Sequence, residues 1–492
     1  MSRLYADAAK VLEKVLSREK RHRGGLKAHL FTLTGFGDED GSKSRGKVKV
    51  YALVTETVRH MAILREVLLR AKCGNMGIKN EAMKFVVVFD YLFGKGIQGG
   101  GSVKRAVTSA GDKLKRALEA VRAAHKGDET FGIIPRAPSL PRYVRANTVK
   151  ISPEEAHTAL VEAGHAPTID PHVPYVLRLP SGARIYDHPL VKSCAIILQD
   201  KSSCFPAHVL VDALSALGGS VRKDDAVEVI DACAAPGNKT SQLAAYLALS
   251  NYKNCRVRAY DKDEKRAGIL KRRMAEAGCA EGIGRDLVQS FHADFLATDP
   301  EDPAFRNVRA VLLDPTCSGS GIVGRVERGI HAENNRSSGE GKNAESERIA
   351  ALAEFQSRCI DHAFSFPQVD VVVYSTCSVH VEENESVVAG ALARTRETSD
   401  PFGLAPRECV LPGWDRRGVE CAGLSEEESA RVVRADYAHD DTNGFFVSCF
   451  ARERLLRAFA SKRKRKEKMK QRRKKRRRGK KRKREEEEEK VF

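Results

Sequence analysis

The chain has 492 residues, of which 42% are hydrophobic and 30% charged, and its formal net charge is +20. This length is too great for one hydrophobic core and predicts two or three domains. Because no apolar run reaches the roughly 18 to 20 residues of a membrane helix and no secretory signal opens the chain, we expect an intracellular protein without a membrane partner.

Most of the positive charge lies at one end of the chain. Residues 461–492 contain 20 Lys or Arg and 6 Glu, a net charge of +14, which leaves +6 for the residues before them. Such a block cannot bury apolar surface, so residues 453–492 are predicted to form a disordered basic tail unless they bind a polyanion. The tail fits a nuclear or nucleolar localisation signal, an RNA-binding segment or both, and the alternative is a tail that only increases solubility.

The twelve cysteines are scattered through the chain without any C-x-x-C pair. This spacing supports neither a zinc cluster nor a redox dithiol, so no metal site is expected. Most of the twelve are predicted to be small core residues.

Residues 1–130 are predicted to form a helical N-terminal accessory domain, because apolar residues recur at helical spacing in 3–15 and 54–71. The apolar run 85–89 fits a buried helix or a buried strand. A basic helix is expected over 104–126, and its Lys and Arg side chains either contact phosphates or form a solvated helix face.

Residues 131–205 contain short strands and turns and predict a small α+β domain that binds RNA. Residues 142–147 form a predicted basic strand, and residues 152–155 carry a capping pattern that begins a helix.

Residues 206–452 alternate apolar strands with helix-compatible sequence, which predicts an α/β domain with a doubly wound parallel sheet. The parallel strands are expected at 227–231, 257–261, 287–292, 308–314 and 369–375. Segments 432–437 and 444–450 are close enough to form an antiparallel hairpin at the sheet edge. The polar segment 324–346 interrupts the alternation and predicts a mobile surface loop, a candidate lid.

Small residues follow the first strand, in the turn from Asp231 to Gly237. They let the backbone approach a ligand closely, and the free amides of the next helix favour a carboxylate or phosphate. Asp261 follows the second strand, where an acidic side chain accepts hydrogen bonds from ribose hydroxyls; the alternative is a helix cap. Asp294 follows the third strand and can bond an adenine amino group beside Phe295, an apolar residue placed to pack on the ring.

Two cysteines follow the fourth and fifth strands. Cys317 lies in the segment from Asp314 to Gly321, and Cys377 comes directly after a run of β-branched residues. Because ligands bind at the carboxyl edge of such a sheet, we expect both thiols and Asp314 to meet there. Either cysteine alone is more simply a packed thiol, but two of them, each followed by Ser at a strand end, indicate a functional pair.

This set of groups fits methylation of carbon 5 of cytosine. Carbon 5 is too electron-poor to take a methyl group directly from a sulfonium donor, and a thiolate that adds to carbon 6 makes it nucleophilic. The reaction needs a reactive thiol, an acid near ring nitrogen 3 and a base for the carbon-5 proton. Cys377, Asp314 and Cys317 can supply these roles.

The motifs DACAAPGNKT (231–240), DPTCSGSG (314–321) and STCSVHVEENE (375–385) occur in this order. With flanking signatures they span residues 130–452, and over this range the sequence closely resembles the Nol/Nop/Sun-domain RNA 5-methylcytosine methyltransferases. YALVTETVRH and LFGKGIQGGG in the N-terminal part, together with Asn238, look like the fifth Sun-domain subgroup, which modifies large-subunit ribosomal RNA.

The resemblance implies a Rossmann-like, S-adenosylmethionine-dependent methyltransferase domain over 206–452. It implies Cys377 as the nucleophile and Cys317 as the residue for proton removal and release of the covalent adduct. The implied binding site for S-adenosyl-L-methionine consists of Cys233, Ala234, Ala235, Pro236, Gly237, Asn238, Lys239, Asp261, Arg266, Asp294 and Asp314.

We therefore expect an RNA cytosine-5 methyltransferase that acts on large-subunit ribosomal RNA in the nucleolus, as a monomer, with pre-ribosomal particles as candidate partners. The alternative is a ribosome-assembly factor whose RNA binding matters and whose catalysis is dispensable. A methyltransferase for proteins or small molecules would leave the paired cysteines and the basic tail unexplained.

Overall fold

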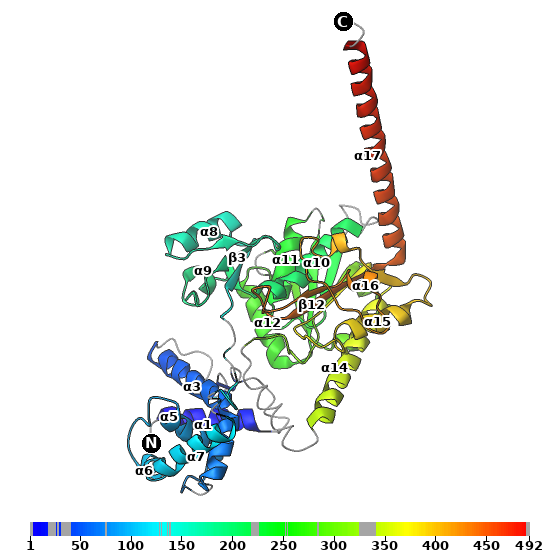
Figure 1. The fold of residues 1–492 in the computed structure, drawn as a ribbon. Helices are drawn as coiled ribbons and strands as arrows, with labels where there is room; N and C mark the ends of the chain where they lie inside the picture. Colours follow the sequence, from blue (N-terminus) through cyan, green and yellow to red (C-terminus); the bar gives the residue numbers. More distant parts are fainter. Residues whose placement is uncertain are drawn as a thin grey trace. The chain divides into compact units, whose positions relative to one another are not determined.

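The structure is a computed structural model (Figure 1), and it describes residues 3–17, 26, 29–30, 41–73, 76–126, 128, 130–134, 136, 139–217, 226–250, 252, 254–282, 285–323 and 341–488. The described residues of 1–137 and 324–347 form one compact unit, and those of 138–323 and 348–492 form a second. No helix within these residues has both the length and the apolar character needed to cross a membrane.

The first unit is built from helices whose apolar faces share one core. Their bounds are α1 Arg3–Leu16, α3 Gly41–Arg59, α4 Met61–Arg70, α5 Glu81–Leu92, α6 Ser102–Ser109 and α7 Gly111–Ala124. The apolar run 85–89 lies inside α5, which begins where the Asn80 side chain accepts a hydrogen bond from the amide of Met83. The basic helix predicted over 104–126 is two helices, broken at Ala110.

A small sheet opens the second unit. Its antiparallel strands run in the order β2-β3-β1-β4, with β1 Arg142–Ala146, β2 Thr168–Ile169, β3 Val176–Leu179 and β4 Ile196–Leu198. The helices beside it are α8 Pro153–Glu162 and α9 Pro189–Lys192, and α8 begins with the predicted capping box between Ser152 and Glu155. The boundary predicted between residues 205 and 206 falls inside the helix α10, Lys201–Leu217. The small sheet and the large sheet belong to the same compact unit.

The large sheet contains eight strands in the order β10-β12-β9-β8-β5-β6-β7, with β11 paired to β12. The strands are β5 Val227–Asp231, β6 Cys255–Asp261, β7 Val288–His292, β8 Val308–Leu313, β9 Val371–Thr376, β10 Phe402–Leu404, β11 Val433–Ala435 and β12 Phe445–Arg452. β5 to β9 are parallel, as the sequence predicts. The predicted hairpin of β11 and β12 is present, but β12 lies between β9 and β10 rather than at the edge.

Helices cover both faces of this sheet. Val371 and Val373 of β9 face a core shared with α10, α11 Asn238–Leu249 and α12 Glu264–Glu276. Val372 and Tyr374 face the opposite core, shared with α14 Gly341–Phe364 and α15 Glu385–Thr395. Short turns of helix complete the unit: η2 Phe295–Ala297, η3 Pro303–Phe305, η4 Arg407–Cys409 and α16 Glu426–Ser429. Successive residues of β9 thus face opposite cores, as expected for a parallel strand that is buried on both faces.

Two predicted irregular segments differ in the structure. Residues 324–340 of the candidate lid lie outside the described residues, and residues 341–346 form the start of α14. The tail predicted to be disordered is the single helix α17, Glu453–Glu488 (Figure 1). Lys, Arg and Glu are strong helix formers, and pairs such as Glu453 with Arg457 add support one turn apart.

Candidate active site

The carboxyl ends of the parallel strands bring the predicted residues to one edge of the large sheet. β5 ends at Asp231 and β6 at Asp261, while Asp314 follows β8 and Cys377 follows β9. These strands are neighbours in the order β9-β8-β5-β6, so the four positions lie side by side. Ligands bind at this edge in open α/β sheets.

The two thiols lie next to each other. The Sγ atoms of Cys317 and Cys377 are 3.3 Å apart. The hydrogen bond to Cys377, followed by burial, raises the pKa of Cys317 well above the ordinary value of a thiol. Cys317 therefore holds its proton more tightly than an ordinary thiol, and either sulfur can be the donor across the contact between them.

A lysine and a carboxylate form an ion pair at the same edge. The Nζ atom of Lys239, in the first turn of α11, lies 2.6 Å from Oδ2 of Asp314, and the Ser375 hydroxyl donates to Oδ1 of Asp314 at 2.8 Å. Burial lowers the pKa of Lys239, but the Asp314 carboxylate and Cys377 raise it, and the net shift is upward. Lys239 is thus held as a cation next to Asp314, whereas the family resemblance implies a place for it among the cofactor residues.

The turn between β5 and α11 ends in a glycine that its backbone conformation and its packing against α12 both require. Gly237 has a φ of +107°, and a Cβ atom at this position would lie 2.5 Å from the Cε atom of Met274. α11 begins at Asn238 without a side-chain cap, and the buried Oδ1 atom of Asn238 has no hydrogen-bond partner in the described part of the chain. Uncapped amides and a free amide oxygen fit the carboxylate and ammonium groups of S-adenosylmethionine.

Asp261 and Arg266 lie on the other side of this turn. Arg266 Nη2 donates to the carbonyl oxygen of Ala235 at 2.6 Å and lies 3.2 Å from Oδ2 of Asp261. The amide of Ala235 donates to the same carboxylate at 3.3 Å. Asp263, and not Asp261, caps α12, so the helix-cap alternative does not account for Asp261. The Asp261 carboxylate instead contacts the backbone of the turn between β5 and α11.

The third acidic position has a local structural role. Asp294 accepts a hydrogen bond from the amide of Leu296 at 3.0 Å and caps η2. The prediction that Phe295 packs on an adenine ring is wrong, because its ring is 3% exposed and stacks on Phe366 in the core. Burial raises the pKa of the Cys233 thiol well above its ordinary value, so this cysteine of the turn stays neutral.

Two buried charged residues near the site are not predicted from the sequence. Arg145 of β1 is fully buried and donates to Gln199 Oε1 at 3.0 Å and to Ser241 Oγ of α11 at 2.8 Å. This arginine of the predicted RNA-binding domain therefore holds the helix that carries Lys239 and does not face solvent. The second residue, Glu383, contacts the segments that follow both cysteines, through the amide of Ser318 and the hydroxyl of Ser378. The serine after Cys377 is the sequence signal that points to it.

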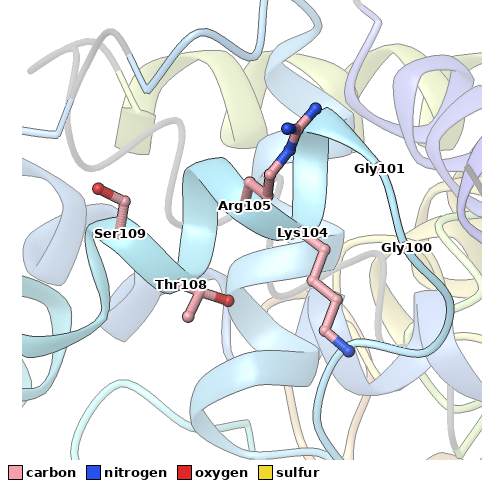
Figure 2. Close-up of a pocket in the computed structure, with 6 residues that line it drawn as sticks. All are labelled: Gly100, Gly101, Lys104, Arg105, Thr108 and Ser109. Carbon is pink, nitrogen blue, oxygen red and sulfur yellow. The ribbon is translucent and has the colours of Figure 1, made fainter.

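Basic side chains lie on the surface of the helical unit. Those exposed on α6 and α7 and after α7 are Lys104, Arg105, Lys113, Lys115, Arg116 and Lys126. α6 also borders a shallow pocket of about 370 Å³, lined by Gly100, Gly101, Lys104, Arg105, Thr108 and Ser109. Figure 2 shows that Lys104 and Arg105 extend in opposite directions, so they do not converge on one small ligand. Such a surface fits dispersed contacts to phosphates.

Two parts of the chain match known families. Residues 220–450 match the family described as 16S rRNA methyltransferase RsmB/F. Residues 48–130 match the N-terminal domain of NOL1/NOP2/Sun domain family member 5. The second match covers most of the helical unit.

Full-length relatives agree with these matches. The chain is 34% identical over 481 residues to a 28S rRNA (cytosine-C(5))-methyltransferase of Mus musculus, covering 92% of each chain. It is 33% identical to the 25S rRNA (cytosine-C(5))-methyltransferase NSUN5 of Arabidopsis thaliana, over 92% of this chain and 74% of the relative. The crystal structure of PH0851 has the same fold, with a TM-score of 0.55 at 19% identity over 92% of this chain and 99% of the other. The chain belongs to the NOL1/NOP2/Sun-domain family of S-adenosylmethionine-dependent RNA cytosine-C5 methyltransferases.

Proposed function

We propose that this protein methylates carbon 5 of a cytosine in large-subunit ribosomal RNA, with Cys377 as the nucleophile and Cys317 as the residue that completes the reaction. The observation that carries the proposal is the pair of thiols, 3.3 Å apart, at the carboxyl edge of the sheet. The mouse and Arabidopsis relatives are named for 28S and 25S rRNA, and each similarity spans 92% of this chain, which supports large-subunit RNA as the substrate.

Cys377 begins the reaction by adding its thiolate to carbon 6 of the cytosine. The new carbon–sulfur bond uses the electrons of the thiolate, and those of the 5,6 double bond move toward carbon 4 and nitrogen 3, which leaves an enamine. Lys239 is the cation that offsets the charge arriving at nitrogen 3, and Asp314 holds it at 2.6 Å. S-adenosylmethionine supplies, when bound, the electrophilic methyl group for carbon 5.

Cys317 then removes the proton from carbon 5. The electrons of that carbon–hydrogen bond restore the 5,6 double bond, and the carbon–sulfur bond breaks to release Cys377 as a thiolate. The hydrogen bond to Cys377 is the largest cause of the raised pKa of Cys317, ahead of burial, and this bond weakens once the Cys377 sulfur becomes a thioether. Cys317 can then lose its own proton to solvent and accept the proton of carbon 5.

The methyl donor is held by groups around the turn after β5, residues 233–238. The uncapped amides of α11 and the free Oδ1 atom of Asn238 bind its amino-acid end, and Asp261 accepts hydrogen bonds from its ribose. Arg266 keeps the Asp261 carboxylate and the Ala235 carbonyl in place. Asp294 is proposed to accept a hydrogen bond from the adenine amino group. It would use Oδ2, because Oδ1 accepts the amide of Leu296 at the start of η2.

RNA is proposed to contact the exposed basic side chains of α6 and α7 and the Lys and Arg of α17. α17 holds most of the net charge of the chain, and a tract of this kind also fits a nucleolar address. We propose that the protein acts in the nucleolus as a monomer, on RNA within pre-ribosomal particles.

Bisulfite sequencing tests this proposal. Ribosomal RNA from cells without the protein is incubated with the purified enzyme and S-adenosylmethionine, and the Cys377→Ala variant serves as the control. The proposal expects a discrete cytosine of the large-subunit RNA to become resistant only with the unaltered enzyme. Equal methylation by Cys377→Ala, or methyl label in protein rather than RNA, would contradict it, and rescue of ribosome assembly by Cys377→Ala would favour the assembly-factor alternative.

A further inference from the structure

Glu383 is a fully buried carboxylate that takes part in no ion pair among the described residues. A buried charge is costly unless hydrogen bonds replace its hydration. Three donors surround it: the amide of Ser318 at 2.8 Å, Nε2 of Gln356 at 3.0 Å and the hydroxyl of Ser378 at 2.5 Å. The charge is therefore tied to three separate segments of the chain.

Two of these donors belong to the residues that directly follow the cysteines. Ser318 follows Cys317, and Ser378 follows Cys377. The two serine hydroxyls also lie 3.1 Å apart, with Ser318 donating to Ser378. One carboxylate thus connects the segment after β8 with the segment after β9, directly next to the thiol pair.

The two cysteines depend on this connection to different degrees. Cys377 directly follows β9, whose six residues are all buried and all pair with β12, while the first four, Val371 to Tyr374, also pair with β8. Cys317 lies in a segment without helix or strand. Beyond Cys317, the amide of Gly321 donates to the carbonyl oxygen of Cys377 at 2.8 Å, and the residues on either side of Cys317 are held by side chains from elsewhere. Gln356 of α14 donates to the carbonyl oxygen of Thr316 at 3.2 Å, and Glu383 accepts the amide of Ser318.

We propose that Glu383 is a positioning residue that holds Cys317 against Cys377. This inference rests on the proposed roles of the two cysteines. Loss of the carboxylate would loosen the Cys317 segment at Ser318, while the bonds at Thr316 and Gly321 remain, and would leave Cys377 at the end of its strand. Addition to carbon 6 would continue, whereas proton removal and release would slow, and covalent enzyme–RNA adduct would accumulate. A misplacement of about 1 Å in an active site is enough to cost roughly 100-fold in rate.

The test uses the Glu383→Gln variant of the full chain, in which an amide with two donor hydrogens replaces one carboxylate oxygen. The exposed neighbour provides the matched control, Glu382→Gln. Radiolabelled substrate RNA and S-adenosylmethionine are added, and the covalent adduct is measured on a denaturing gel beside the rate of product formation. We expect Glu383→Gln to raise the adduct fraction about tenfold and lower turnover about 100-fold, with Glu382→Gln unchanged. A parallel fall of adduct and turnover would overturn the proposal.

The geometry can be measured without RNA. Mild oxidation should join the two thiols as a disulfide, with diamide as the oxidant that is reduced by the two electrons and two protons they release. Because the Sγ atoms are 3.3 Å apart in the intact site, we expect this bond to form at least tenfold more slowly in Glu383→Gln than in Glu382→Gln. Equal rates would show that Glu383 does not hold the pair together.

Two further variants separate the possible failures. If Cys317→Ala accumulates adduct and folded Glu383→Gln does not, the positioning inference fails while the proposed roles stand. If Cys317→Ala itself accumulates none, the proposed division of roles fails. Should Glu383→Gln not fold, Gln356→Met removes the donors to Thr316 and Glu383, together with an acceptor of the Tyr374 hydroxyl, without changing the charge. It is expected to accumulate adduct in the same way, and its failure to do so would overturn the inference.

Discussion

Asp231 is buried at the end of β5, and its protonation should make the stability of the second unit depend on pH. Asp231 is only 1% exposed, and its carboxylate accepts a hydrogen bond from the Thr240 hydroxyl at 2.8 Å. Burial, which outweighs the opposing Thr240 hydrogen bond, raises its pKa from 3.8 to about 7. The folded state therefore keeps a proton that the unfolded chain loses above about pH 4. This contribution to stability is complete below the unfolded pKa and is lost as the pH rises through about 7.

The Asp231→Asn variant keeps the size of the side chain and removes its titration. One pKa unit corresponds to about 1.36 kcal/mol, so between about pH 5 and about pH 8 the free energy of unfolding should fall by about 2.5 kcal/mol more in the unaltered protein than in the variant. Titrating groups distant from Asp231 cancel in this difference, and the uncharged amide contributes a constant offset; Asp314 and Lys239, which interact with Asp231, are the neighbours whose titration the variant also changes.

Urea denaturation followed by tryptophan fluorescence measures this quantity. Trp414 is the single tryptophan and is buried in the same core as Val227 and Val229 of β5, so its signal reports the unit that contains Asp231. A difference between the two proteins that stays constant from about pH 5 to about pH 8 would refute the reasoning, because it would mean that the folded protein does not hold the proton.

Three other substitutions test the packing of the site, the cofactor turn and the ion pair. Gly321→Ala places a Cβ atom 2.2 Å from the carbonyl oxygen of Gly444 and should cost about 1 to 3 kcal/mol in urea denaturation; an unchanged midpoint would contradict this contact. Arg266→Ala removes the partner of Asp261 and should weaken S-adenosylmethionine binding about tenfold by calorimetry, whereas equal affinity would exclude that role. Lys239→Met should lower kcat by about 100-fold with an unchanged circular dichroism spectrum, and full activity would remove Lys239 from the mechanism.

The parallel core of the fold is predictable from the sequence because its strands are short apolar runs separated by helix-compatible segments. β10 is not predicted, since three residues are too few to show a period and its pairing with β12 is a tertiary contact. The helical state of α17 is missed for another reason. The composition of residues 453–488 excludes a buried core, but it does not exclude an isolated helix of strong helix formers.

The site is predictable where residues lie directly at strand ends. Asp261, Asp314 and Cys377 lie along the same sheet edge because parallel strands end there, and Cys317, four residues beyond β8, contacts Cys377. The burial of Phe295 cannot be read from its position, because the same strand end can face a ligand or the core. Arg145 and Glu383 are missed because most of their partners are distant in the sequence: Ser241 of α11 for Arg145, and Gln356 of α14 and Ser318 for Glu383.

The most direct test of the central claim identifies the sulfur that bonds to RNA. The Cys317→Ala variant is incubated with substrate RNA and S-adenosylmethionine, the protein is digested, and the nucleotide-bearing peptide is sequenced by mass spectrometry. The account predicts a modified cytosine attached through carbon 6 to Cys377, and no adduct in the Cys317→Ala, Cys377→Ala double variant. Adduct that forms on Cys317 in a Cys377→Ala protein, with methyl transfer retained, would contradict it.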